Sequence, residues 1–437
     1  MNIKNPFSSS DPLCETIQTH KQGRPVGVYS ICTANLNVLQ AAMRSHRKNE
    51  NLLLIESTCN QVNQEGGYSG MTPAQFAVYL QVIAGDMNFP AERIVLGGDH
   101  LGPNPWKNEK ASIAMEKAEK LVADSVTAGY VKIHLDTSMP CGDETTLSAE
   151  TIAERSAQLC LQAEKTAHEC GLLRMPVYVI GTEVPTPGGM TVDQLDERSI
   201  TKVEFAEQTL QIYRQVFSRY KLDEAFQRII AMVISPGVEF NDKEIFPYDH
   251  AKTEPLSKFI DAVPGMVYEA HSTDYQTPQA LKQMVEDHFA ILKVGPALTF
   301  AFRETVFQLA SIENEIIFPE DNRSHIMDVL LTTMQQQPSH WKSYYSGTDE
   351  EIQLGLKFGF SDRARYYWGY PAVHTAYLKM MFNLSKKYIP LSLISQYFPQ
   401  LFPLVKNHYL DPLPISLIFA SIEQVLLQYQ KACGLIG

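Results

Sequence analysis

Cysteine is scarce in this chain of 437 residues, and none of its seven cysteines belongs to a Cys-x-x-Cys pair. The seven are an odd number and are scattered from Cys14 to Cys433. Disulfide frameworks and zinc knots need cysteines in closely spaced sets. The sequence therefore argues against a disulfide-stapled scaffold and against a structural zinc knot.

Positive charge is also in deficit, because 37 lysines and arginines face 49 aspartates and glutamates for a net charge of −12. Such a balance gives no long-range attraction to nucleic acid or to an anionic membrane, so an anionic ligand must be held by local groups. The chain has no apolar run of about 18 residues, and residues 1–24 are polar and lack the apolar core of a signal peptide. We expect a cytoplasmic protein that binds neither nucleic acid nor membranes.

Nucleotide-binding fingerprints are missing as well. The sequence has no G-x-x-x-x-G-K-[ST] loop, no G-x-G-x-x-G after a strand-like segment, and no H-R-D or D-F-G set. Their absence argues against kinase activity.

What the chain does have is 44% hydrophobic and 20% charged residues, which is enough to bury a sizeable core. Apolar, strand-like segments alternate with helix-like stretches, several of which begin at cap residues such as Thr72, Ser148 and Thr277. This alternation predicts an α/β fold, a (β/α)8 TIM barrel with a C-terminal helical extension. The expected strands are residues 27–34, 51–58, 93–100, 130–137, 177–184, 228–235, 266–273 and 289–296.

The change of pattern along the chain predicts three parts. We expect an N-terminal polar segment over residues 1–24, the (β/α)8 barrel over residues 25–310, and the helical extension over residues 311–437.

Polar residues gather where the expected strands end. In a (β/α)8 barrel the carboxyl ends of the strands meet at one mouth, where catalytic groups lie. We therefore expect a site at this mouth built from Asn60, Asp99, His100, His134, Asp136, Ser138, Glu183, Glu269, His271, Ser272, Thr273 and Lys293.

Two histidines and a carboxylate from different strands match the ligand set of a catalytic zinc ion. His100, His271 and Glu183 would be those ligands. Alternatively, both histidines are hydrogen-bonded in a polar mouth that holds no metal. Asp99 and Asp136 are candidates for proton transfer, or for orienting a histidine ring. Glu183 is a third candidate for proton transfer.

Glycine-rich loops surround these residues, and free backbone amides in such loops bind phosphate. Tight turns that require glycine are the alternative explanation. The predicted substrate-binding residues are Asn60, His134, Ser138, Glu269, Ser272, Thr273, Lys293 and Gly295.

The segment SDRARYYWGYP, residues 361–371, concentrates Arg363, Arg365 and aromatic residues. Arginine and tyrosine are favoured in protein interfaces, and arginine also binds phosphate. We favour an interface, or packing of the aromatic residues on the barrel with the arginines at its rim, over contact with substrate.

Several longer motifs carry a resemblance. The segments ESTCNQVNQEGGYSGMTP, LGGDHLGPNPW, KIHLDTSM, VIGTEVPTPGG, PGVEF, VYEAHSTDYQT and ILKVGPALTFAFRE, in this order, resemble the Z-type (GatZ/KbaZ) subunit family of tagatose-1,6-bisphosphate aldolase. The resemblance runs from about residue 25 into the tail. The family is related to class II, zinc-dependent ketose-bisphosphate aldolases and has also carried the label tagatose-6-phosphate kinase.

The resemblance also implies roles for individual residues. Asp99-His100, Asp136, Glu183 and His271-Ser272-Thr273 match the proton-transfer, metal and phosphate positions of the catalytic class II enzymes. Two strands depart from that pattern. Ser235 follows the sixth strand where the catalytic enzymes have a zinc histidine, for which Glu183 or Glu239 are candidate replacements, and Lys293 stands on the eighth strand where they have asparagine.

The resemblance implies an accessory, non-catalytic subunit that supports a catalytic Y-type aldolase subunit in galactitol or N-acetylgalactosamine catabolism. We expect an oligomer that retains a sugar-phosphate site, with zinc as the candidate cofactor. The alternative is a metal-dependent sugar-phosphate aldolase or epimerase in its own right. A tagatose-6-phosphate kinase is the weaker alternative, because the nucleotide motifs are missing.

Overall fold

A computed structural model describes residues 11–47, 49–182 and 200–436 of the chain. Eight parallel strands close into a barrel in the order β1-β10-β9-β6-β5-β4-β3-β2. The barrel closes because β1 pairs with both β10 and β2. The predicted (β/α)8 fold is confirmed, with strands β1 (Val28–Ile31), β2 (Leu53–Thr58), β3 (Ile94–Leu101), β4 (Lys132–Leu135), β5 (Val177–Ile180), β6 (Ile229–Val233), β9 (Val267–Ala270) and β10 (Ile291–Val294).

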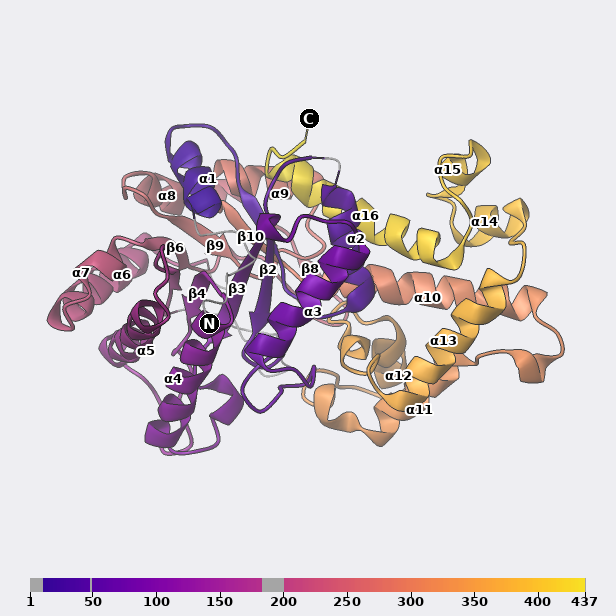
Figure 1. Cartoon of the computed structure of the whole chain (residues 1–437), viewed down its shortest axis with the longest axis horizontal. Helices are drawn as coiled ribbons and strands as arrows, with labels where there is room; N and C mark the ends of the chain where they lie inside the picture. Colours follow the sequence, from indigo (N-terminus) through magenta and orange to yellow (C-terminus); the bar gives the residue numbers. More distant parts are fainter. Residues whose placement is uncertain (1–10, 48, 183–199, 437) are drawn as a thin grey trace.

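Helices follow the strands and cover the outside of the barrel (Figure 1). The expected cap residues act as predicted. Thr72 forms a capping box with Gln75, and Ser148 and Thr277 each accept a hydrogen bond from the first turn of their helix. These helices are α2 (Leu36–His46), α3 (Pro73–Asp86), α4 (Ala111–Thr127), α5 (Ala149–Glu169), α6 (Val203–Arg219), α7 (Asp223–Phe226), α8 (His250–Asp261), α9 (Pro278–Glu286) and α10 (Pro296–Ile316). A short antiparallel pair, β7 (Glu239–Phe240) and β8 (Ile245–Phe246), follows β6.

Beyond α10 the chain forms a helical extension to one side of the barrel (Figure 1). Its helices are α11 (Ile326–Gln336), α12 (Asp349–Phe358), α13 (Pro371–Ser385), α14 (Leu391–Tyr397), α15 (Phe402–Lys406) and α16 (Pro414–Ala432), with a 3-10 turn, η6 (Arg363–Tyr366), between α12 and α13.

The last helix, α16, returns to the barrel and packs against α2, α9 and α10. Gln430 donates to the Ser45 hydroxyl at 2.9 Å, and the Tyr429 hydroxyl donates to the Thr273 carbonyl at 2.9 Å. The far end of the chain thus lies against the helices that flank the eighth and first strands. The domain boundary at residue 310 stays a prediction. In the structure, the last helix of the extension packs against helices of the barrel.

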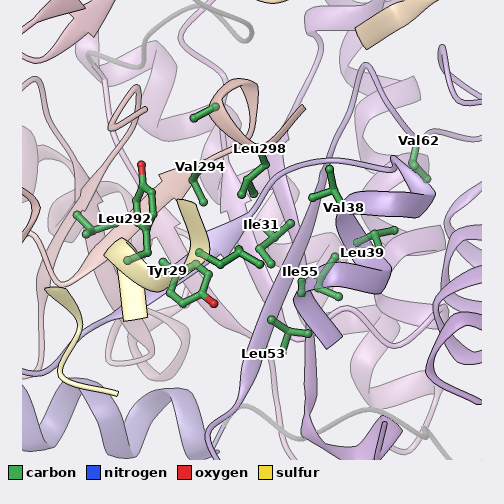
Figure 2. Packing of buried hydrophobic residues seen from close by; sticks show 14 of the residues in the cluster. Tyr29, Ile31, Val38, Leu39, Leu53, Ile55, Val62, Leu292, Val294 and Leu298 are labelled. Carbon is green, nitrogen blue, oxygen red and sulfur yellow. The ribbon is translucent and has the colours of Figure 1, made fainter. Parts of the chain in front are cut away.

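Two apolar clusters divide the core because side chains alternate across each strand. Outward residues such as Ile31, Ile55 and Leu292 pack against helices, as Figure 2 shows around Val38 and Leu39 of α2. Each fully buried side chain of this kind stabilises the fold by roughly 1.5 to 3 kcal/mol.

The second cluster fills the lower part of the barrel interior with apolar residues such as Leu54, Val267 and Ile291. Helix α1 (Asp11–Lys21) adds Leu13 and Ile17 to this cluster, with exposed fractions of 0% and 1%. The amino-terminal segment that the sequence marks only as polar therefore includes an amphipathic helix that packs on the interior cluster. In the part of the chain that the structure describes, no helix is long and apolar enough to cross a membrane.

Candidate functional site

Above the apolar layer, the barrel interior becomes charged within two residues along several strands. Leu54 is followed by Glu56, Val267 by Glu269, and Ile291 by Lys293, and each pair shares the inward face of its strand. Lys132 of β4 completes this charged layer.

The charged layer is held by ion pairs with almost no exposure to solvent. Lys132 Nζ lies 2.5 Å from Glu56 Oε1 and 2.6 Å from Glu269 Oε2. Lys293 contacts the other oxygen of Glu56 and lies 3.0 Å from Asp99 Oδ1. Buried charges are costly unless they are paired, so this arrangement indicates a role other than stability.

An irregularity in β3 positions Asp99 and His100 at the mouth. The register with β4 shifts between Gly98 and Leu101, and His100 has a left-handed backbone with φ of 49°. In a regular strand, two successive side chains face opposite sides of the sheet. A bulge of this kind changes their directions, so that both can reach the mouth. Gly97 is required beneath it, because a Cβ atom there would lie 2.9 Å from the Glu56 side chain.

Three imidazoles meet at this point, namely His100, His134 of β4 and His271 at the end of β9. Their ring centroids are 4.8 to 5.3 Å apart, and all three are buried. Asp99 completes a set in which one potential ligand atom of each residue lies within 4.8 Å of the others.

Carboxylates orient each of the three rings. Asp136 Oδ2 accepts from His100 Nδ1 at 2.8 Å, and Glu269 Oε1 accepts from His271 Nε2 at 3.1 Å. Asp99 Oδ1 lies 3.1 Å from His134 Nδ1. Metal-binding histidines are typically oriented by a carboxylate on their other nitrogen. The backbone amide of His100 also donates to His134 Nδ1 at 3.2 Å, so both partners of the ring lie on its Nδ1 side. His134 Nε2 is buried and has no hydrogen-bond partner among the described residues.

The pKa values show how strongly these groups are coupled. Burial opposes ionisation of Asp136, but the hydrogen bond and charge of His100 outweigh it and lower the pKa of Asp136 to about 2. Burial likewise opposes ionisation of Glu269, yet Lys132 and His271 lower the pKa of Glu269 to about 2. Burial also lowers the pKa of Lys293 to about 8.

The donor set fits a divalent cation. Glu56, Asp99, Asp136 and Glu269 contribute four buried carboxylates, which Lys132 and Lys293 only half balance. The cluster contains three imidazoles, and one of them, His134, has a buried nitrogen without a hydrogen-bond partner among the described residues. Imidazoles are ligands that zinc and similar metals prefer. The cluster therefore has the chemistry and the charge to hold a divalent metal. Glu183, the third ligand expected from the sequence, lies outside the described residues.

A cleft opens above this cluster at the barrel mouth. His100, His271, Asp99 and Lys293 lie at its base. Its other lining residues are Cys32, Thr58, Asn60, Gln61, Tyr68, Phe240, Ser272, Asp274, Val294, Gly295, Pro296, Arg365 and Tyr366.

Comparison with known proteins supplies the context for this site. The chain matches, over residues 13–434, the family described as D-tagatose-1,6-bisphosphate aldolase subunit GatZ/KbaZ-like. The chain belongs to the GatZ/KbaZ-like family. Relatives named D-tagatose-1,6-bisphosphate aldolase subunit GatZ are 46% identical in Klebsiella pneumoniae, over 96% of this chain and 99% of the relative, and 47% identical in Escherichia coli, over 96% and 99%.

A solved structure shares the whole fold. The crystal structure of a probable tagatose 6 phosphate kinase from Sinorhizobium meliloti is 42% identical, with a TM-score of 0.86, and the alignment covers 93% of this chain and 100% of that one. Relatives of GatZ/KbaZ-like proteins have thus been given both an aldolase-subunit name and a kinase name.

This GatZ/KbaZ-like chain brings together most of the residues predicted from its sequence, but in unequal positions. Asn60, Ser272, Lys293 and Gly295 line the cleft. His134 and Glu269 lie beneath its floor, in contact with the residues that form it. Ser138 instead donates to Asp136 at 2.7 Å.

Thr273 and Gly295 are already engaged within the protein. Thr273 is fully buried and donates to the Lys293 carbonyl at 2.6 Å, so it lies away from the cleft. The Gly295 amide donates to Asp274 at 3.1 Å, and the Ala297 amide donates to the same oxygen at 2.7 Å. The carboxylate of Asp274 thus occupies the amides that the sequence suggests for phosphate.

The structure gives Arg363 and Arg365 different surroundings, and the interface interpretation stays a prediction. Arg363 is buried, with its guanidinium 3.6 Å from the centre of the Tyr344 ring, and Arg365 lines the cleft. The helical extension therefore contributes directly to the site.

Two contributions escaped the sequence analysis. Lys132 is a charged residue two positions before His134 in an apolar strand, and that period of two could have revealed its inward face. His134, which the sequence predicts to bind substrate, also belongs to the cluster of potential metal ligands, in a chain whose sixth strand is followed by Ser235.

Proposed function

We propose that this chain is a subunit of a D-tagatose-1,6-bisphosphate aldolase and acts as the accessory partner of a separate, Y-type catalytic subunit. The observation that carries the proposal is the identity of 46% over 96% of this chain and 99% of the GatZ relative. The assembly would split tagatose 1,6-bisphosphate into glyceraldehyde 3-phosphate and dihydroxyacetone phosphate. We place it in the cytoplasm, as an oligomer, in galactitol or N-acetylgalactosamine catabolism.

Zinc is the metal that this proposal assigns to His100, His134 and His271, with Asp99 beside them. When bound there, it would supply a Lewis acid for the carbonyl oxygen of a ketose phosphate. The support is the cluster of potential ligand atoms within 4.8 Å and the unpaired, buried Nε2 of His134.

The residues around the cluster have separate tasks in this proposal. Asp136 holds the His100 ring from Nδ1, and Ser138 holds Asp136. Lys293 forms an ion pair with Asp99 at the base of the cleft, with 3.0 Å between Nζ and Oδ1. Glu239 accepts from the Ser272 hydroxyl at 3.1 Å, and burial raises the pKa of Glu239 to about 7, which suits a group that moves a proton near neutral pH.

A second candidate function is a metal-dependent sugar-phosphate aldolase or epimerase in its own right. The specific observation in its favour is the third imidazole, because His134 offers the ligand that the sixth strand lacks. A kinase function has weaker support, namely the name given to the Sinorhizobium meliloti relative.

The deciding experiment is retro-aldol cleavage of tagatose 1,6-bisphosphate, with triose phosphate detected. The purified chain is assayed alone with zinc and again with a Y-type subunit. If the chain by itself produces no triose phosphate but raises the rate or the lifetime of the Y-type subunit, the accessory function is supported. Turnover by the chain alone, lost with chelator and with His271→Ala but kept with His168→Ala on the exposed face of α5, supports the independent enzyme.

If the chain neither cleaves the substrate by itself nor affects the Y-type subunit, both candidate functions are contradicted. Epimerase assays and ATP-dependent phosphorylation of tagatose 6-phosphate would then follow.

A further inference from the structure

We propose that Arg365 and Tyr366, from the helical extension, form a binding site for the phosphate group of the ligand at the outer part of the cleft. The two residues line the same cleft as His100, His271 and Lys293, although they lie more than 70 residues beyond the last barrel strand. The chemical class of the ligand is a phosphate monoester whose remaining part points toward the histidines.

The hydrogen bonds of Arg365 leave one edge of its guanidinium available. Nη1 donates to the carbonyls of Ser361 and Asp362, and Nη2 donates to the Tyr366 hydroxyl at 2.9 Å. No described residue accepts a hydrogen bond from Nε. The Nε–H and the second Nη2–H form the side-on fork that binds a phosphate through two parallel hydrogen bonds.

Tyr366 adds a third donor beside this fork. Its oxygen accepts from Arg365, so its own proton remains available for an acceptor in the cleft. The ring is held edge-on against Tyr68, another residue of the cleft, with centroids 4.6 Å apart.

The turn that bears both residues is fixed on the barrel. The carboxylate of Asp362 accepts from Arg303 Nε at 3.0 Å and from Thr299 Oγ1 at 2.5 Å, both on α10. Arg363 Nε donates to the His340 carbonyl at 2.6 Å. A donor set fixed in advance loses little conformational freedom when a ligand binds, which favours affinity.

The usual alternative position for phosphate is already filled. In this fold phosphate commonly binds amides after the last two strands, but Asp274 accepts the amide protons of Gly295 and Ala297. A negative carboxylate on these amides repels a phosphate there. Arg365 lies on the wall of the same cleft and carries the permanent positive charge that the amides can no longer offer.

Calorimetric titration of the full-length chain, without a partner subunit, tests the proposal with three probes: dihydroxyacetone phosphate, inorganic phosphate and dihydroxyacetone. Arg365→Gln removes a charge-assisted, two-point contact. We expect its affinity for the two phosphate probes to fall about 10- to 100-fold, while its affinity for dihydroxyacetone stays unchanged. Arg365→Lys keeps the charge without the fork and should fall in between.

Arg219→Gln is the matched control, since Arg219 is an exposed arginine of α6 paired with Glu150 and Glu154 of α5. Its affinities should equal those of the unaltered chain. Because Arg365 also binds two backbone carbonyls, thermal unfolding is measured for each variant, and Tyr366→Phe provides a second test that preserves those contacts. It should weaken phosphate binding by a smaller factor.

Two outcomes would overturn the proposal. One is equal affinity of Arg365→Gln and the unaltered chain for both phosphate probes, and the other is failure of the unaltered chain to bind either probe at millimolar concentration. The inference rests on the proposed function only for the identity of the sugar. If phosphate binds through Arg365 but no aldolase activity is supported, the site stands and the aldolase-subunit proposal fails.

Discussion

The lower and upper layers of the barrel interior are built from the same strands, yet they solve opposite problems. Below, Leu54, Val267 and Ile291 bury apolar surface beneath α1. Two residues further along, Glu56, Glu269 and Lys293 bury charge. Replacing such a charged layer by apolar residues is often neutral or stabilising, so a protein that keeps one indicates that the charges serve binding or chemistry.

Among the substitutions that test these two layers, Lys132→Met should change the free energy of unfolding most. The substitution leaves Glu56 and Glu269 without the ammonium group that lies 2.5 and 2.6 Å from them. Loss of one partner from a buried ion pair costs about 3 to 5 kcal/mol, which urea unfolding would measure. Lys120→Met is the control, because the Lys120 pair with Asp124 is exposed and should contribute under about 1 kcal/mol. Equal unfolding midpoints for both variants would mean that the charged layer is not coupled.

The lower layer gives a smaller effect through Ile17→Ala on α1. The side chain is 1% exposed and packs on the interior cluster, so its truncation should lower the free energy of unfolding by about 2 to 4 kcal/mol. Glu15→Ala changes an exposed position of the same helix and should have almost no effect. If both variants unfold alike, α1 does not close the barrel.

Beside the upper layer, stability should respond to pH through Asp274 of the loop after β9, where burial is the main cause that raises the pKa from 3.8 to about 6. The unfolded chain ionises this carboxyl first as pH rises. Its contribution to stability is therefore complete below pH 4 and is lost as pH rises toward 7, with a total of up to about 3 kcal/mol.

Asp274→Asn removes the titration but keeps an oxygen that can accept the amides of Gly295 and Ala297. The difference in unfolding free energy between the two proteins, measured at several pH values, should shift in favour of the variant between pH 4 and 7. A constant difference across that range would refute the assignment.

The same two layers explain how far the sequence could predict this molecule. Strands, caps and barrel closure follow from local periodicity, and the ends of all eight strands lie within four residues of their expected positions. Asp99, His100 and His271 were also recognisable as strand-end residues.

Long-range pairing was not recognisable from the sequence. The match of Lys132 with Glu56 and Glu269, and the approach of Arg365 to the cleft, depend on which strands and helices become neighbours in space. The return of α16 to the ring of helices has the same origin, since nothing local to residues 414–432 specifies α2 and α9 as partners.

The smallest expected effect separates function from stability within the upper layer. Asp136→Asn leaves an amide whose oxygen can still accept from His100, but it removes the charge that fixes the ring with Nδ1 protonated. Loss of a carboxylate behind a metal-binding histidine weakens metal affinity about 10- to 100-fold. Zinc titration against a chromophoric chelator should show this decrease, while Asp86→Asn, on the exposed end of α3, should bind zinc like the unaltered chain. Two outcomes would contradict the metal site: equal zinc affinity of the Asp136 variant and the unaltered chain, or no stoichiometric zinc binding by the unaltered chain. The three imidazoles would then form only a hydrogen-bonded cluster. The two lysines alone would balance the charge of the four carboxylates.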